Sequence, residues 1–184
     1  MEATDILMEE HRVIERVLAA LETAASRLRS GEAISPAIFL QAAEFIKGFA
    51  DGCHHKKEEG VLFPAMRAVG VTGEGGPIGV MLAEHHEGRE LTSSMRAAAE
   101  RLASGDADAR AELARSALNY VALLRQHITK EENVLFPMAE QVLKGPAQVE
   151  VSEAFERVER EETGEGVHER FLELATSIER LVAE

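Results

Sequence analysis

The chain lacks tryptophan altogether and has one tyrosine and one cysteine among its 184 residues. Because Cys53 has no second cysteine to pair with, an intramolecular disulfide is excluded. No stretch approaches the roughly 20 consecutive apolar residues that a membrane-spanning helix needs. The acidic first residues also lack the basic and apolar regions of a secretory signal. These absences predict a soluble, cytoplasmic protein.

Positive charge is also scarce, because 20 lysines and arginines face 33 acidic residues and leave a formal net charge of −13. A chain of this charge repels nucleic-acid phosphates and anionic membrane surfaces, but it does not repel metal cations. Aromatic residues make up only 4%, and the β-branched residues that favour strands are comparatively few. Alanine, leucine, glutamate and arginine dominate, and all four favour helix. We therefore expect an all-α protein with no nucleic-acid or membrane partner.

Apolar residues recur at helical spacing in four stretches that proline and glycine residues separate. The expected helices cover residues 4–28, 36–64, 77–102 and 107–136. Four long helices with short connections predict an up-down-up-down four-helix bundle within residues 1–145. Residues 146–184 are expected to add a C-terminal helical appendage to the same domain, with breaks at Gly164 and Gly166. Its apolar faces could serve either intramolecular packing or formation of a homodimer.

An internal repeat is the most informative feature of the sequence. Residues 54–64, HHKKEEGVLFP, recur as residues 127–137, HITKEENVLFP, with eight of the eleven positions identical. A weaker echo lies upstream, where Glu10-His11 matches Glu84-His85. Each half of the chain therefore reads as a helix with one histidine followed by a helix with His-x-x-x-Glu. Two such hairpins could bring their histidine-bearing faces together in one core.

The spacing within the repeat has a physical reason. Residues four apart lie one turn apart on the same face of a helix, so His54 with Glu58 presents an imidazole and a carboxylate to one point. His127 with Glu131 does the same. Imidazole suits zinc, copper, iron and nickel, and a carboxylate can bridge two cations. Two such pairs and two single histidines supply six ligands, which suits a dinuclear site and is too many for one tetrahedral zinc.

Two other interpretations of the same residues remain open at this point. One His-x-x-x-Glu alone is commonly a surface polar pair, so a purely structural helical adaptor is an alternative to a metal protein. A ferritin-like carboxylate enzyme would use two Glu-x-x-His motifs. The chain has one, which ends at His168 outside the expected bundle. The repetition of histidine, glutamate and Val-Leu-Phe-Pro together favours the metal site.

The pattern of His11, His54-x-x-x-Glu58, His85 and His127-x-x-x-Glu131 resembles the hemerythrin-like, His-His-Glu cation-binding family over about residues 5–140. The strings KEEGVLFP, GPIGVMLAEHHE and QHITKEENVLFP resemble the bacterial branch that includes di-iron proteins for the repair of iron centres. The resemblance implies a four-helix bundle with two non-haem iron ions and an oxo or hydroxo bridge between them. The residues at the family's terminal-ligand positions are His11, His54, His85 and His127. Those at its bridging positions are Glu58 and Glu131.

Several further residues are candidates near this site. Oxygen-carrying members of the family have a fifth histidine at the position of Arg89, and His168 could swing over the bundle to supply it. Tyr120 lies two turns before His127 on one face, as a core residue or a hydrogen-bond donor toward the site. Glu59 and Glu132 are candidates to support the ligands. His55 and His86 lie about 100° round their helices from the ligands and are expected to face a neighbouring helix or solvent.

The function that the resemblance implies is binding of, or reaction with, a small molecule such as oxygen, nitric oxide or peroxide, in sensing, scavenging or stress defence. An iron pair with an open coordination position suits such chemistry. The alternative is an iron donor or storage module for the repair of iron-sulfur centres. The cysteine pair that repair proteins carry in a separate domain does not occur in this sequence. The sequence does not decide between simple binding and enzymatic turnover.

Overall fold

The computed structural model describes residues 3–164 and 166–184, and every regular element within these residues is helical. The predicted all-α class is therefore confirmed. The first helix of the bundle is α1 (Ala3–Arg29), and the third is α5 (Pro77–Ala103). Ser35 caps the second helix through its hydroxyl, and Pro36 follows at the first helical position. Serine suits the N-cap because its hydroxyl accepts a hydrogen bond from a backbone N–H of the first turn. Proline suits the first helical position because it has no N–H to leave unpaired there.

The second and fourth helices contain π-helical segments, labelled η. The second helix consists of α2 (Pro36–Phe45), η1 (Ile46–His54), α3 (His55–Lys57), η2 (Glu58–Leu62) and α4 (Phe63–Ala68). The fourth consists of α6 (Ala109–Lys130), η3 (Glu131–Leu135) and α7 (Phe136–Val142). The prediction that these helices end near Pro64 and Phe136 is thus wrong. The wider i→i−5 turns of η2 and η3 precede each proline, and the helix continues past it.

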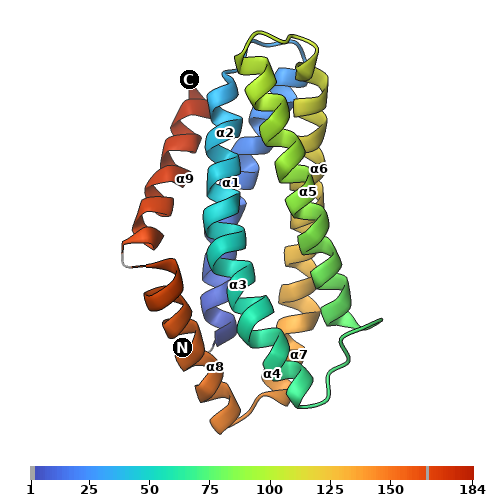
Figure 1. Cartoon of the computed structure of the whole chain (residues 1–184), viewed down its shortest axis with the longest axis vertical. Helices are drawn as coiled ribbons and strands as arrows, with labels where there is room; N and C mark the ends of the chain where they lie inside the picture. The colour runs from blue at the N-terminus through green and yellow to red at the C-terminus, as the bar shows by residue number, and fades with distance from the viewer. Residues whose placement is uncertain (1–2, 165) are drawn as a thin grey trace.

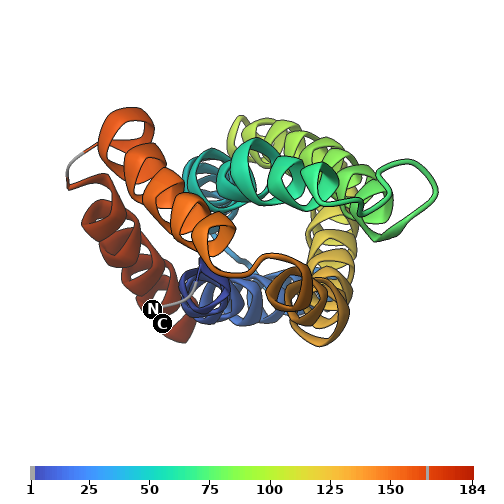
Figure 2. The same cartoon turned by 90° about the horizontal axis from the view of Figure 1, so that it is seen from below.

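The four long helices form a closed antiparallel bundle (Figures 1 and 2). α1 packs against α2 and α6, and α5 packs against the same two helices. Short connections at residues 30–35, 69–76 and 104–108 join successive helices, so neighbours along the chain run antiparallel. None of the helices in the described part of the chain is both long and apolar enough to cross a membrane.

The C-terminal residues form α8 (Pro146–Arg157), η4 (Val158–Thr163) and α9 (Val167–Ala183). These helices lie along the outside of the bundle beside α1 and the second helix (Figure 1). Phe171, Ala175, Ile178 and Val182 recur at helical spacing on α9 and are buried against the bundle. The amphipathic pattern of this segment is therefore satisfied within the chain.

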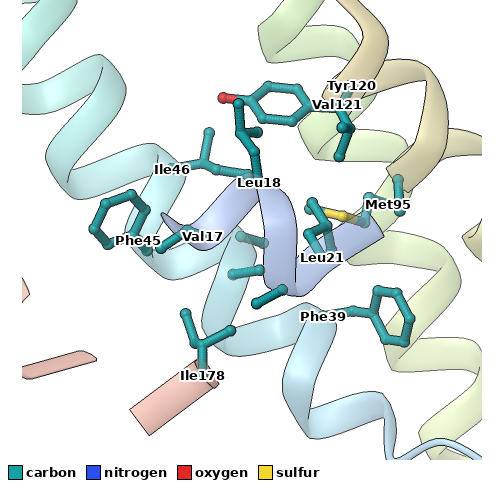
Figure 3. Packing of buried hydrophobic residues seen from close by; sticks show 14 of the residues in the cluster. Val17, Leu18, Leu21, Phe39, Phe45, Ile46, Met95, Tyr120, Val121 and Ile178 are labelled. Carbon is teal, nitrogen blue, oxygen red and sulfur yellow. The ribbon is translucent and has the colours of Figure 1, made fainter. Parts of the chain in front are cut away.

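The buried apolar residues form two clusters, one on each side of a polar layer. The first cluster includes Val17, Leu18, Phe39, Met95 and Tyr120 (Figure 3). The second cluster contains Leu7, Phe63, Met81, Phe136 and Phe155, among others. Along each bundle helix the change from one cluster to the other occurs at a buried histidine. The bundle thus keeps a layer of ionisable side chains inside an apolar core.

Candidate metal centre

Four histidines, one from each long helix of the bundle, meet in the polar layer. They are His11 on α1, His54 at the end of η1, His85 on α5 and His127 on α6. Each is at most 1% exposed. The Nε2 atoms of His11 and His54 lie 3.1 Å apart, and those of His85 and His127 also lie 3.1 Å apart. The four rings therefore form two pairs.

Two buried glutamates lie between the histidine pairs and reach both of them. Glu58 places Oε1 3.7 Å from His54 Nε2 and Oε2 3.4 Å from His85 Nε2. Glu131 places Oε2 3.2 Å from His11 Nε2 and Oε1 3.0 Å from His127 Nε2. Each carboxylate thus presents one oxygen to each pair. This is the arrangement in which a carboxylate can bridge two cations.

A second set of carboxylates holds the far side of the imidazoles. The Nδ1 atoms of His54 and His127 contact Glu10 and Glu84, each at 3.0 Å. The Nδ1 atoms of the other two rings contact Glu132 and Glu59, at 3.0 and 2.7 Å respectively. A carboxylate can only accept a hydrogen bond from a ring N–H, so Nδ1 carries the proton and Nε2 keeps its lone pair. All four rings are therefore oriented as metal ligands.

Each of these outer carboxylates also contacts a cationic side chain. The pairs are Glu10 with Lys57, Glu84 with Lys130, Glu59 with Arg89 and Glu132 with Arg12. The negative charge of each outer carboxylate is therefore balanced by a neighbouring lysine or arginine. The inner carboxylates, Glu58 and Glu131, have no lysine or arginine partner among the described residues. The centre of the layer is thus left with two negative charges that only the imidazoles face.

The same charges shift the pKa values of His54, His85 and His127 in the absence of a metal. Burial opposes a charge on His127, but the Glu131 carboxylate and Glu84 raise its pKa to about 10. Burial likewise opposes a charge on His54 and His85, while the glutamates around them raise the pKa of both above the ordinary value. In the metal-free protein, protons on the imidazoles therefore offset the inner carboxylates. Metal ions would displace those protons.

Unpaired polar atoms show that these residues fit a metal site. Both carboxylate oxygens of Glu58 and Oε1 of Glu131 are buried without a hydrogen-bond donor in the described structure. Buried polar atoms left unpaired are costly, and most have a partner in native proteins. In each histidine pair, two Nε2 lone pairs also face the same space. Cations held between the rings and carboxylates would satisfy both sets of atoms. Two groups of ligand atoms close enough to hold one ion each occur here, and His11, His54 and Glu131 form one of them.

Comparison with known proteins agrees with this geometry. The sequence profile of the Hemerythrin HHE cation binding domain matches residues 2–139 and, in a second match, residues 96–184. The chain belongs to the hemerythrin family. Hemerythrin HHE domains bind metal cations, typically iron, and the buried histidine and glutamate groups described above could hold such ions.

Relatives of this hemerythrin-family chain occur in mycobacteria. One protein of Mycobacterium bovis and two of Mycobacterium tuberculosis, each described as uncharacterised, are 27% identical to it over 178 residues. The similar region covers 97% of this chain and 69% of each relative. No solved structure matches the chain.

The structure places the further candidate residues in three different ways. Glu59 and Glu132 contact His85 and His11, as described above. Tyr120 is buried in the apolar cluster, and its hydroxyl has no hydrogen-bond partner in the described structure. His168, at the start of α9, lies outside the bundle wall. Its ring packs 5.3 Å from that of Phe49, and one of its nitrogens is close to Glu10 and Cys53 rather than to the four histidines.

Two residues that accept hydrogen bonds from the histidines of the layer were missed. Glu10 and Glu84 precede the single histidines, and each holds the histidine of the neighbouring helix rather than its own neighbour in sequence. The signal that could have revealed them was present, because both Glu-His pairs are part of the internal repeat. His86 is exposed, with its side chain 75% accessible. His55, in contrast, is buried and faces the centre.

Proposed function

We propose that this protein holds two iron ions between its four histidines and two inner glutamates, and that the pair binds or reacts with a small molecule such as oxygen, nitric oxide or peroxide. The observation that carries the proposal is the placement of Glu58 and Glu131, each with one oxygen toward either histidine pair. His11 and His54 would hold one ion, and His85 and His127 the other. An iron pair supplies electrons and an open coordination position to such molecules.

Burial favours a small ligand. His11, Glu58 and Glu131 are not exposed at all, so only a molecule that can diffuse through the packed wall reaches them. A cavity of about 490 Å³ opens between η1 and α5, and Asp51 and Arg89 are part of its lining. Arg89 in turn holds Glu59, the carboxylate on His85. One lining residue, Arg89, thus contacts an outer carboxylate of the centre, and we propose this side of the bundle as the entry for a diatomic molecule or peroxide.

The contacts that fix the proposed ligands favour a protein that retains its iron over one that donates it. Each imidazole is fixed by a carboxylate, and each of those carboxylates is fixed by a lysine or arginine. Such outer contacts raise metal affinity, and their loss typically weakens it about 10–100-fold. A donor of iron would need ligands that let the metal go. Ligands that are buried and fixed in this way suit a centre that retains its metal while the small molecule binds and dissociates.

The test is to load the metal-free protein with ferrous iron under anaerobic conditions, remove the excess and count the bound iron. We expect about two ions per chain, as six protein ligands require. Air, nitric oxide and peroxide are then added separately while the near-ultraviolet and visible spectrum is recorded. New charge-transfer bands with the iron still bound support the proposal. Absence of retained iron, or two bound irons whose spectrum none of the three reagents changes, overturns it. Rapid transfer of the iron to a chelator would indicate a donor instead.

A further inference from the structure

A second cluster of ligand-type side chains lies beside the candidate metal centre, where the C-terminal helices pack against the bundle. Glu10 of α1, Cys53 of η1 and His168 of α9 each place one possible ligand atom within 4.8 Å of the other two. The Cys53 sulfur lies 3.7 Å from Oε1 of Glu10. Cys53 and Glu10 are 1% and 3% exposed, and His168 is half-buried. Three elements that are far apart in the sequence thus bring a thiol, an imidazole and a carboxylate together.

A cavity of about 460 Å³ opens onto this cluster, and Cys53 and His168 are part of its lining. The described residues of the lining also include three carboxylates and one arginine, Glu156, Glu159, Glu169 and Arg160. Carboxylates therefore outnumber the arginine along this surface. A metal cation would be attracted by the excess of negative charge, and the cavity would let it reach the sulfur and the imidazole from solvent.

The buried Lys57 lies next to the cluster, so its charge has to be counted. Its ammonium group contacts Glu10 and lies 2.6 Å from Oε1 of Glu159. A metal ion that binds Cys53 displaces the thiol proton and leaves a thiolate. The thiolate and the two glutamates then have three negative charges, which Lys57 and a divalent ion offset. The lysine therefore does not exclude a divalent cation from the cluster.

The donor atoms of the cluster select the class of ion. Thiolate sulfur and imidazole nitrogen are typical ligands of zinc, and a carboxylate oxygen can complete such a site. Magnesium and calcium prefer oxygen ligands and are therefore disfavoured. Three protein ligands leave one position of a tetrahedral ion for water, which the cavity can supply.

We propose that Glu10, Cys53 and His168 form a second metal site, separate from the proposed iron pair, that binds one zinc-class divalent cation. Glu10 connects the two sites, because its Oε2 oxygen contacts His54 while Oε1 faces Cys53. His168 lies in the first turn of α9, so the ion also links the C-terminal helices to the bundle. The site uses none of the four histidines or two inner glutamates of the candidate centre and can be tested without iron.

The test is a titration of the metal-free protein with cobalt(II), which substitutes for zinc and gives a near-ultraviolet charge-transfer band when a thiolate binds it. Cobalt held by the four histidines and inner glutamates gives no thiolate band, because those ligands offer only nitrogen and oxygen. We expect the band to saturate at about one thiolate-bound cobalt per chain, and we expect excess zinc to remove it. Cys53→Ser should lack the band.

The histidine variants test whether His168 is a ligand. Loss of a contact that only supports a ligand weakens metal affinity about 10–100-fold, so in His168→Ala the affinity for cobalt should fall at least about tenfold. The control is His86→Ala, which removes an exposed histidine and should match the wild type. Zinc should also slow the alkylation of Cys53 by iodoacetamide in the wild type and in His86→Ala, and much less in His168→Ala.

Three results would overturn the second site: a wild-type protein without the thiolate band, a band of wild-type affinity in His168→Ala, or equal protection of Cys53 by zinc in that variant. Each of these results leaves the proposed iron pair standing, because the pair is tested by iron content and by its own spectrum. Failure of the iron pair likewise leaves the cobalt band unaffected. Circular dichroism of each variant checks that the helices are intact.

Discussion

The two inner glutamates differ from every other carboxylate around the centre. Glu58 and Glu131 lie one turn after a ligand histidine on their own helix and reach a second histidine on a neighbouring helix. The outer glutamates each hold one imidazole and one cationic side chain. Substitution of an inner glutamate therefore affects both metal positions, whereas substitution of an outer glutamate changes how firmly one ligand is held.

Substituting Glu58 or Glu131 by glutamine tests this difference at the level of one side chain. A neutral amide offers one oxygen and no charge, so it cannot bridge two cations as a carboxylate does. We expect each variant to retain about one iron per chain or less, with loss of the charge-transfer bands of the pair. Iron counting and the visible spectrum provide the measurement. The control is Glu90→Gln, because the Glu90 side chain is 70% exposed and pairs with the exposed His86 rather than with a histidine of the layer. Two irons in Glu58→Gln would contradict the bridging role.

Glu10 allows a test that needs no metal. Burial would raise its pKa, but contacts with His54 and Lys57 lower it from 4.5 to about 2. Because the folded pKa lies below the unfolded one, the ionised carboxylate stabilises the fold above about pH 4.5. That stabilisation is lost as the pH falls toward 2. For the metal-free protein we expect wild type to exceed Glu10→Gln in free energy of unfolding by up to about 3 kcal/mol at pH 7.

The measurement is urea unfolding of both metal-free proteins at a series of pH values. The difference in free energy should narrow as the pH falls from about 5 to about 2, because protons bind the carboxylate of the unfolded chain from about pH 4.5 but that of the folded protein only near pH 2. Glu9→Gln is the matched control, since Glu9 is the exposed residue next in sequence. A gap between wild type and Glu10→Gln that stays constant with pH would show that the ionised carboxylate is not what stabilises the fold.

At the scale of elements, the docking of α9 depends on one glycine of η1. A Cβ atom added at Gly48 would lie 1.9 Å from the Phe171 ring, far inside van der Waals contact. Phe171 is 6% exposed and belongs to the apolar cluster of the bundle. Only glycine therefore lets α9 approach η1 this closely.

Gly48→Ala should force Phe171 away from η1 and loosen α9. Burial of an aromatic side chain contributes about 1.5–3 kcal/mol, and we expect a loss of about 2 kcal/mol in the free energy of unfolding. The matched control is Gly60→Ala in η2, where a Cβ meets nothing within 4 Å. There alanine should stabilise the helix by up to about 1 kcal/mol. Urea unfolding of both variants gives the comparison, and equal effects of the two substitutions would contradict the close approach of α9.

The helices themselves were predictable because apolar periodicity, proline and glycine all mark them locally. The continuation of the second and fourth helices past Pro64 and Pro137 was not predictable, because proline by itself favours the end of a helix. Each proline lies just after a π-helical segment, η2 or η3. The docking of α8 and α9 was also not predictable, since an amphipathic face does not specify which surface it will cover.

Helical spacing and the internal repeat also explain which residues of the candidate centre were predicted and which were missed. The repeat indicated His11, His54, Glu58, His85, His127 and Glu131, and the structure brings all six together. His55 was expected to face away because about 100° of rotation separates it from His54 on a regular helix. η1 ends at His54, and an extra residue per turn shifts the faces of the residues around it. The partners of Glu10 and Glu84 lie on other helices, which spacing within one helix cannot reveal.

At the scale of the whole molecule, the polar layer divides the core. The two apolar clusters lie on either side of it, and the four bundle helices all contribute a histidine to it. Without a metal, the charge of the two inner carboxylates is buried, and among the described residues only protons on the imidazoles offset it. An iron pair would tie the four helices together at this level and remove that cost. Metal binding and folding are therefore expected to be coupled.

Removal of the iron tests this coupling. A ligand that binds only the folded state stabilises it by about 2.7 kcal/mol when its concentration is 100 times the dissociation constant. For a chain of this size, 1 kcal/mol shifts the melting temperature by about 2–4 °C. We therefore expect the iron-loaded protein to melt at least about 5 °C above the metal-free protein, with calorimetry under anaerobic conditions as the measurement. The double variant Glu58→Gln/Glu131→Gln should melt at the same temperature with and without iron. A wild-type protein whose melting temperature does not respond to iron would show that the layer is stable without it, and that protons on the histidines suffice to hold the bundle together.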